Sequence, residues 1–363
     1  MKREERASGA AAEQADGAGA AGRRGNGKVT LKDVAARAGV SIKTVSNVVN
    51  GYAHITPETR TRVEAALEEL GYRPNLSARH LRRGASGIIA LVVPELDVPY
   101  FAELARHVIG AAAERSLTVI IDQTDGDPER ERFALDGDRA LLLDGLILSP
   151  LGLSREELAE RRDRTPLVLL GEHISGGPVD HVWIDNVAAA RAATEHLLAL
   201  GRRRIAAIGD QPYEHGETAQ LRTRGFVTAL QEAGIAPDQR LIVPVPRFHR
   251  EHGARAMEQL LDLEQPPDAV FAFNDLVALG ALRVALSRGL RVPEDVAIVG
   301  FDDVEDGRYS TPTLTTIAPD KERIARLALD SLTARIDGDG DQPARELEAP
   351  FELVVRESTA GRG

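Results

Sequence analysis

The segment VTLKDVAARAGVSIKTVSNVVNG, residues Val29–Gly51, decides the fold of the N-terminal part of this 363-residue chain. Apolar residues recur at helical spacing over 31–38, and Gly39 suits a left-handed position that ends this helix. Ser41 suits the N-cap of a second helix over 42–50, whose apolar face is narrow. The segment therefore predicts two short helices joined by a tight turn.

The stretch that follows predicts a third helix. Thr56 is a suitable N-cap, Pro57 fits the first helical position, and Gly71 fits the end. Three such helices are typical of a helix-turn-helix unit, although an ordinary three-helix packing unit fits the same pattern. A helix with short polar side chains and few acids can enter a major groove. Residues 41–50 contain no Asp or Glu, which favours DNA binding.

Charge is distributed unevenly along the chain. The formal net charge is −11, but residues 1–84 hold 15 Lys/Arg against 9 Asp/Glu, a net +6. The remaining residues hold 30 and 47, a net −17. A basic head on an acidic body indicates a small polyanion-binding module attached to a domain of another kind.

Composition excludes several functional classes. The chain has no cysteine, which excludes disulfides, thiolate zinc sites and a cysteine nucleophile. Its nine histidines show no metal-ligand spacing and no nucleophile–base set stands out, so we expect no metal, no cofactor and no enzymatic activity. Residues 1–28 indicate a disordered tail without a secretory apolar stretch, and no apolar run approaches the roughly 18 residues of a membrane span. We therefore expect a cytoplasmic protein that does not bind membranes.

The body alternates apolar strands with amphipathic helices. One series of expected strands covers residues 88–94, 117–123, 145–150 and 166–171, and a second begins at 181–186 and continues with 204–209, 241–246, 269–274 and 296–302. This order predicts an α/β fold with two doubly wound lobes, each a parallel sheet covered by helices on both faces. Because ligands of such sheets bind at the carboxyl ends of the strands, a ligand cleft is expected between the lobes.

Polar residues stand where that rule places a ligand. Asn274 and Asp275 lie at the end of one expected strand, and Asp302 lies at the end of another. Asp185 lies at the crossing between the two series, and Arg222 opens a helix. Carboxylates and an arginine can grip vicinal hydroxyls through bidentate hydrogen bonds. A helix N-cap is the alternative role of each carboxylate, and of Asp275 in particular.

The head resembles a known family of DNA-binding proteins. The stretch Val29–Gly51 strongly resembles the DNA-binding head of the lac repressor (LacI/GalR) family, as do ITPETRTRVEAALEELGYRPN (Ile55–Asn75) and LSARHLRRG (Leu76–Gly84). The resemblance continues to about Arg356. It implies a helix-turn-helix head and a hinge helix, followed by a two-lobed, doubly wound effector domain like a periplasmic binding protein.

The resemblance also implies domain limits. Beyond the tail (1–28), it places the helix-turn-helix domain at 29–74, the hinge helix and linker at 75–85, and an effector-binding and dimerisation domain at 86–356. Within that domain, lobe one is expected at about 86–184 plus 317–342, and lobe two at about 185–316 plus 343–356.

Roles in DNA binding follow from the matched positions. Ile42, Lys43 and Asn47 match base-reading positions, where Lys43 can donate to guanine and Asn47 can pair with an adenine edge. Positions that contact or support phosphates are Thr30, Ser41, Thr44, Ser46, Asn50, His54 and Thr56. For His54, a solvated loop histidine is the alternative. Leu81 matches the hinge residue that wedges between base pairs, and a plain basic linker is the alternative for residues 75–83.

Roles in effector binding are implied in the same way. The sites that resemble the family's effector positions are Tyr100, Phe101, Asp185, Arg222, Phe248, Asn274, Asp275 and Asp302, although Tyr100 and Phe101 also fit a core. Gly171 and Glu172 replace an Asp-plus-aromatic pair of purine-responsive members, and Gly216 replaces an arginine of those members. These departures favour a saccharide over a purine.

The expected function is that of a sequence-specific transcriptional regulator. We expect a repressor of sugar-utilisation genes that binds a pseudo-palindromic operator as a homodimer and is released by a small saccharide. The sequence lacks the leucine-rich tetramerising helix that some members carry at their C-terminus, which favours the dimer. A purine- or nucleoside-responsive corepressed regulator is one alternative. A sugar-binding solute receptor without DNA function is another, but it would need an export signal and no basic head.

Overall fold

The computed structural model describes residues 29–49, 52, 54–72, 86–136, 143–212, 216–338 and 342–361. The chain forms two compact units, Met1–Arg79 and His80–Gly363. Three sequence predictions lie outside the described residues: the disordered tail, Asn50, and the hinge helix with Leu81.

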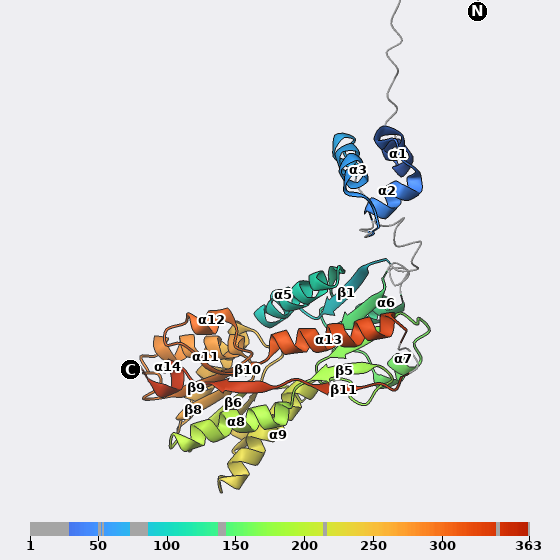
Figure 1. The fold of residues 1–363 in the computed structure, drawn as a ribbon. Helices are drawn as coiled ribbons and strands as arrows, with labels where there is room; N and C mark the ends of the chain where they lie inside the picture. Colours follow the sequence, from blue (N-terminus) through green and yellow to red (C-terminus); the bar gives the residue numbers. More distant parts are fainter. Residues whose placement is uncertain are drawn as a thin grey trace, which may run out of the picture. The chain divides into compact units, whose positions relative to one another are not determined.

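The first unit contains α1 (Leu31–Ala38), α2 (Ile42–Val49) and α3 (Pro57–Glu69), which pack on one another (Figure 1). Their shared core is centred on Val34, Val45 and Val63, which are fully buried. Gly39 ends α1 with a φ of 64°, a left-handed conformation that glycine adopts without a steric cost. The predicted three-helix unit is therefore confirmed.

The second unit contains two six-stranded sheets. Sheet A has the order β11-β5-β4-β3-β1-β2, with β1 (Ile88–Val93), β2 (Thr118–Gln123), β3 (Gly145–Leu148), β4 (Leu167–Leu170), β5 (Asp180–Trp183) and β11 (Glu346–Glu348). Sheet B has the order β12-β10-β9-β8-β6-β7, with β6 (Ile205–Asp210), β7 (Ile242–Pro244), β8 (Ala269–Ala272), β9 (Ala297–Phe301), β10 (Thr315–Pro319) and β12 (Phe351–Val354). Neighbouring strands are parallel except β10 and β12.

Helices cover these sheets, as the strand pattern predicts. Lobe one, built on sheet A, carries α5 (Pro99–Glu114), α6 (Pro128–Asp136), α7 (Arg155–Ala159) and α13 (Lys321–Ile336). Lobe two, built on sheet B, carries α8 (Asn186–Ala199), α9 (Glu217–Glu232), η2 (Gln239–Leu241), α10 (Arg250–Leu261), α11 (Asp275–Ser287), α12 (Glu305–Arg308) and α14 (Glu357–Ala360). Helix α13 packs alongside α5, although the two lie far apart in the sequence (Figure 1).

The lobe limits differ from the sequence prediction at the crossings. The strand pattern was expected to start a second series at 181–186, but β5 pairs with β4 in sheet A, which agrees with the lobe limit of about 184 that the resemblance implies. The chain enters lobe one again only after β10, at about residue 320, and β11 pairs with β5, so residues 346–348 belong to lobe one and not to lobe two. Short buried strands look alike in sequence whichever sheet they join, which explains these errors.

No helix in the described part of the chain is long and apolar enough to span a membrane.

Candidate effector cavity and nucleic-acid interface

Helix α2 presents one face to the core and another to solvent. Val45 and Val48 are buried against the other two helices, whereas Lys43 is exposed and Ile42 is 49% exposed. Asn47 and Ser46 are half-buried on the same helix. The predicted base-reading residues therefore lie on accessible parts of one helix.

Three of the seven predicted phosphate-contacting residues, Thr30, Ser41 and Thr56, are helix caps. The hydroxyl of Ser41 accepts a hydrogen bond from the Thr44 amide at 3.0 Å, and their hydroxyls are 2.8 Å apart. Thr30 caps α1 and Thr56 caps α3. The N-termini of helices carry partial positive charge, so these caps suit an anionic backbone.

One exposed side chain of the head escaped the sequence prediction. Tyr52, which follows α2, is 60% exposed, and its carbonyl accepts a hydrogen bond from the Arg60 guanidinium at 3.0 Å. His54, which was predicted, is exposed in the same loop. The sequence signal that could have pointed to Tyr52 is its place as an aromatic residue close to the end of the predicted recognition helix.

A cavity of about 430 Å³ lies between the lobes of the second unit. Its walls come from segments that follow β1, β3, β4 and β5 of sheet A and β6, β7, β8 and β9 of sheet B. Polar groups thus converge at the carboxyl ends of parallel strands, where the fold predicts a ligand. Of the eight predicted effector residues, those that line the cavity are Tyr100, Phe101, Arg222, Phe248, Asn274 and Asp302.

Arg222 is held rigidly within the cavity wall. It is buried, its Nε donates to Asn186 Oδ1 at 2.7 Å, and an Nη donates to the Phe273 carbonyl. The guanidinium carbon lies 3.5 Å from the centroid of the Phe301 ring. Burial lowers the pKa of Arg222, while Asp302 and Glu172 oppose that shift. The guanidinium remains charged and fixed in position.

Asp302 differs from every other carboxylate at this sheet edge. It is 8% exposed, and its backbone has a φ of 106°, which L-residues rarely adopt. Lys321 donates to its carbonyl, but no described residue donates a hydrogen bond to its carboxylate. Burial raises the pKa of Asp302 to about 6, against the opposing effect of Arg222 and Lys321. A buried acceptor without a donor is suited to a ligand hydroxyl.

The neighbouring Asp303 is engaged by two arginines of the protein. Arg308 and Arg356 donate to its carboxylate at 2.7 and 2.6 Å. Burial would raise the pKa of Asp303, but these hydrogen bonds outweigh it and lower that pKa. Two adjacent aspartates therefore have opposite electrostatic settings, and only Asp302 lines the cavity.

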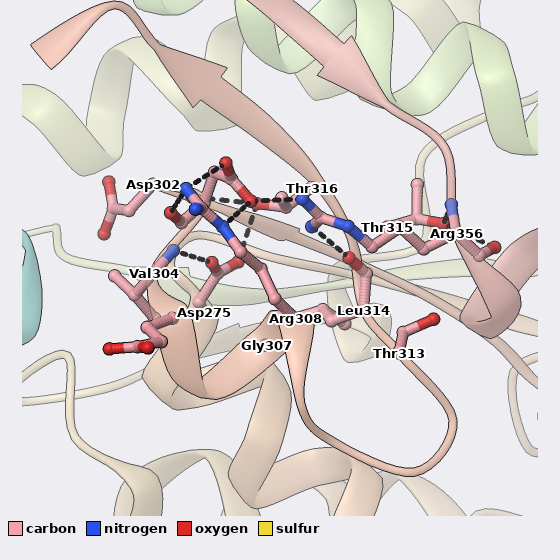
Figure 2. Close-up of polar contacts among 12 residues, drawn as sticks. Asp275, Asp302, Val304, Gly307, Arg308, Thr313, Leu314, Thr315, Thr316 and Arg356 are labelled. Carbon is pink, nitrogen blue, oxygen red and sulfur yellow. Dashed lines mark hydrogen bonds and ion pairs between the residues drawn. The ribbon is translucent and has the colours of Figure 1, made fainter.

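Asp275 and Asp185 do not line the cavity, contrary to their predicted role. Asp275 accepts hydrogen bonds from Thr316 Oγ1 at 2.7 Å and from the Val304 amide at 2.8 Å, which turns it into the protein interior (Figure 2). Asp185 caps α8 by accepting from the Ala188 amide at 2.9 Å. A strand-end position does not say which way a side chain points, so the sequence could not separate these residues from Asp302.

The alternative role of Asp275 as a helix N-cap is also wrong by one position. Asn274 is the N-cap of α11, because its Oδ1 accepts from the Val277 amide at 2.8 Å. Its Nδ2 donates to the Phe248 carbonyl at 3.1 Å. Asn274 therefore fixes both the helix start and the segment that carries the aromatic wall residue.

Several cavity residues were not predicted as contacts, chiefly Glu172, His173, Trp183 and Thr218. Glu172 Oε2 accepts from Thr218 Oγ1 at 3.0 Å, which joins the segment after β4 to helix α9 of the other lobe. Their signal was position, since Glu172 directly follows an expected strand. The departure at Gly216 has a steric basis, because an added Cβ there would lie 2.0 Å from the Gln211 carbonyl oxygen.

Comparison with known proteins agrees with both units. Residues 30–75 match the family of bacterial regulatory proteins called lacI, and residues 194–359 match the periplasmic binding protein-like domain. The transcriptional regulator DegA of Bacillus subtilis is 36% identical over 92% of this chain and 98% of its own length. The chain belongs to the lacI family. It is a DNA-binding transcriptional regulator with a helix-turn-helix head and a two-lobed effector domain.

Other lacI-family proteins are similar over comparable lengths. The repressor CytR of Escherichia coli is 36% identical over 91% of this chain and 96% of its own. A lacI-family regulator from Sanguibacter keddieii superimposes with a TM-score of 0.70, 51% identity, and coverage of 76% of this chain and 99% of that one. The lac repressor dimer bound to operator superimposes with a TM-score of 0.78 and 29% identity, and the match covers 92% of this chain and 99% of that one. The CelR–cellobiose complex superimposes with a TM-score of 0.66 and 35% identity, and the match covers 91% of this chain and 99% of that one.

Proposed function

We propose that this regulator is a cytoplasmic homodimeric repressor that binds a pseudo-palindromic operator through α2. A small saccharide in the inter-lobe cavity releases it from DNA. No enzymatic step is assigned to it. The observation that carries the proposal is the combination of an exposed, acid-free α2 with a cavity in which the buried Asp302 carboxylate receives no hydrogen bond from any described residue.

The similar proteins support both parts of this proposal. The lac repressor is a dimer on its operator, and CelR holds cellobiose. In the present chain, Phe248 and Trp183 supply aromatic walls for a sugar face, and Asp302 and Asn274 supply polar groups for its hydroxyls. A nucleoside effector is the second candidate, because the same aromatic walls suit a base.

The DNA-binding part is tested by selecting binding sites from a randomised duplex library with the full chain. We expect a two-fold symmetric site, because a symmetric dimer reads symmetric half-sites. Lys43→Ala should then lose about 1–3 kcal/mol of discrimination at one position in each half-site. Lys32→Ala is the matched control. It removes the same charge from an exposed position on α1 and should leave sequence preference unchanged.

Two outcomes would contradict this assignment. If Lys43→Ala weakens binding to all sequences equally, Lys43 contacts phosphate and does not read bases. If the wild-type chain selects no sequence, the proposed operator function is wrong.

A further inference from the structure

We propose that the cavity selects its effector by charge and that Glu172 is the residue that sets this selection. The cavity binds uncharged polyhydroxyl or ammonium-bearing molecules and rejects phosphorylated or carboxylated molecules. This inference rests on the proposed function, since it concerns the effector of the same cavity.

Acidic side chains predominate on the cavity wall. The carboxylates that line it are Glu95, Asp125, Glu172, Glu217 and Asp302, against the guanidinium groups of Arg222 and Arg247 and the imidazole of His173. The potential inside a narrow, low-dielectric cleft follows the sign of its lining charges. Asp125 is paired with Arg130 and Glu95 with Arg247, so the negative potential of the cavity comes from Glu172 and Asp302.

Most of the basic side chains that line the cavity are already paired with carboxylates of the protein. Arg247 lies 3.2 Å from Glu95, whose other oxygen is 2.9 Å from His249 Nε2. His173 Nδ1 lies 2.8 Å from Glu217. A cation already paired with a carboxylate offers little attraction to an incoming anion.

Glu172 and Asp302 are left without a cationic partner. Within the described ranges, no Arg, Lys or His nitrogen lies within 4.0 Å of either carboxylate. Glu172 accepts only from neutral groups, the Thr218 hydroxyl at 3.0 Å and the Ile184 amide at 3.5 Å. Both carboxylates act on the same buried Arg222, and both add to the raised pKa of Tyr100, which burial produces in the main. One fixed guanidinium thus stands against two carboxylates.

An anionic effector would meet these carboxylates in a partly desolvated space. Like charges that lie close together repel strongly when water is excluded. Hydroxyl and ammonium groups, by contrast, are donors, and an ionised carboxylate is an acceptor only. Glu172 also bonds to helix α9 through Thr218, so an effector that donates to Glu172 engages both lobes.

The first test needs no knowledge of the effector. Trp183 is the single tryptophan of the chain, and it lines the cavity. We would compare quenching of its fluorescence by iodide and by caesium in the full chain at constant ionic strength. Caesium should quench more efficiently than iodide, relative to free N-acetyltryptophanamide. Glu172→Gln should raise the iodide-to-caesium ratio about two- to five-fold.

The matched control is Glu258→Gln. Glu258 is exposed on α10 and does not line the cavity, so the same change in net charge should leave the ratio unchanged. Iodide quenching that equals or exceeds caesium quenching in the wild type would overturn the proposal. So would a ratio that Glu172→Gln and Glu258→Gln change equally.

The second test compares matched ligands by the Trp183 signal: ribose with ribose 5-phosphate, glucose with glucosamine and glucose 6-phosphate. The phosphorylated member should bind more weakly than its neutral or amino parent, and Glu172→Gln should narrow this difference in affinity. Equal or tighter binding of a phosphorylated member overturns the proposal. Neither test uses DNA, so a failure here is distinguishable from a failure of operator selection, which bears on the proposed function alone.

Discussion

Two buried aspartates, one in each lobe of the effector domain, show how differently one residue type can be used. Asp180, in β5 of sheet A, is 1% exposed and accepts from Arg335 and Arg345 at 2.6 and 2.8 Å and from Ser331. Burial would raise its pKa, but these donors outweigh burial and lower it. Asp302 has no donor to its carboxylate among the described residues, and burial raises its pKa to about 6.

The difference separates a structural carboxylate from one available to a ligand. The donors of Asp180 come from α13 and from the segment before β11, so the residue ties together distant parts of lobe one. Asp302 receives only a contact to its carbonyl from Lys321, whose ammonium also binds Glu103 at 2.8 Å. A buried polar group costs stability unless it is paired, so the cavity-lining carboxylate of Asp302 is suited to the hydrogen bond from an effector that we propose.

The largest effect is expected at Asp180. Asp180→Asn should lower the free energy of unfolding by about 3–5 kcal/mol, because it leaves two arginines without their buried counter-charge. Since the native pKa is lowered, the stabilisation is present above the unfolded pKa of about 3.9 and is lost as pH falls below it. Urea unfolding at pH 7.5 measures the effect.

Asp330→Asn is the control for that measurement. Asp330 pairs with Arg115 at an exposed position of α13, where such a pair contributes about 0–1 kcal/mol. Equal losses in the two variants would contradict the distinction between buried and exposed pairs.

Asp302→Asn should change stability in the opposite direction. Because the native pKa is raised, the ionised carboxylate destabilises the fold above pH 6, and this penalty vanishes as pH falls toward 4. The amide removes the penalty, so unfolding at pH 7.5 should cost about 1–3 kcal/mol more than in the wild type. Effector affinity should fall about ten-fold or more, through the loss of a charge-assisted hydrogen bond. A variant that is both less stable and unimpaired in effector binding would reverse the assignment.

The pH dependence of effector binding gives a finer test of the same residue. A saccharide that shifts Trp183 fluorescence should bind more weakly as pH falls through about 6, since protonation removes the anionic acceptor. Asp302→Asn should lose this dependence and so separates Asp302 from His173 and Glu217, which also line the cavity. A midpoint near 6 that persists in the variant would assign the titration to another group.

Sequence patterns predicted the fold well where the signal is local. The caps of α1 and α3, the left-handed Gly39 and the strand-to-helix alternation all follow from neighbouring residues. The grouping of β5 with the second strand series and the assignment of β11 to lobe two were wrong, because sheet membership depends on long-range pairing that a short buried strand does not encode.

The positions of the strand ends predicted where the cavity lies, but they did not predict the direction in which each side chain points. The sequence gives Asp275 and Asp302 the same position after a buried strand, but hydrogen bonds from Thr316 and Val304 turn only Asp275 inward. Glu172 was noticed only as a departure from related sequences. Among the described residues, no basic side chain forms an ion pair with Glu172. The sequence does not show this, because it depends on which arginines are already paired with other carboxylates.

The smallest effect is expected at Asp185, a carboxylate used as a helix cap. Asp185→Ala should lower the free energy of unfolding by about 1 kcal/mol, because the Ala188 amide loses its acceptor at the start of α8. Effector affinity should stay within two-fold of the wild type by the Trp183 titration, since Asp185 does not line the cavity. Asp185→Asn, which retains a capping oxygen, should recover most of the stability. A loss of effector affinity in both variants, with stability unchanged, would place Asp185 in the binding site beside Asp302.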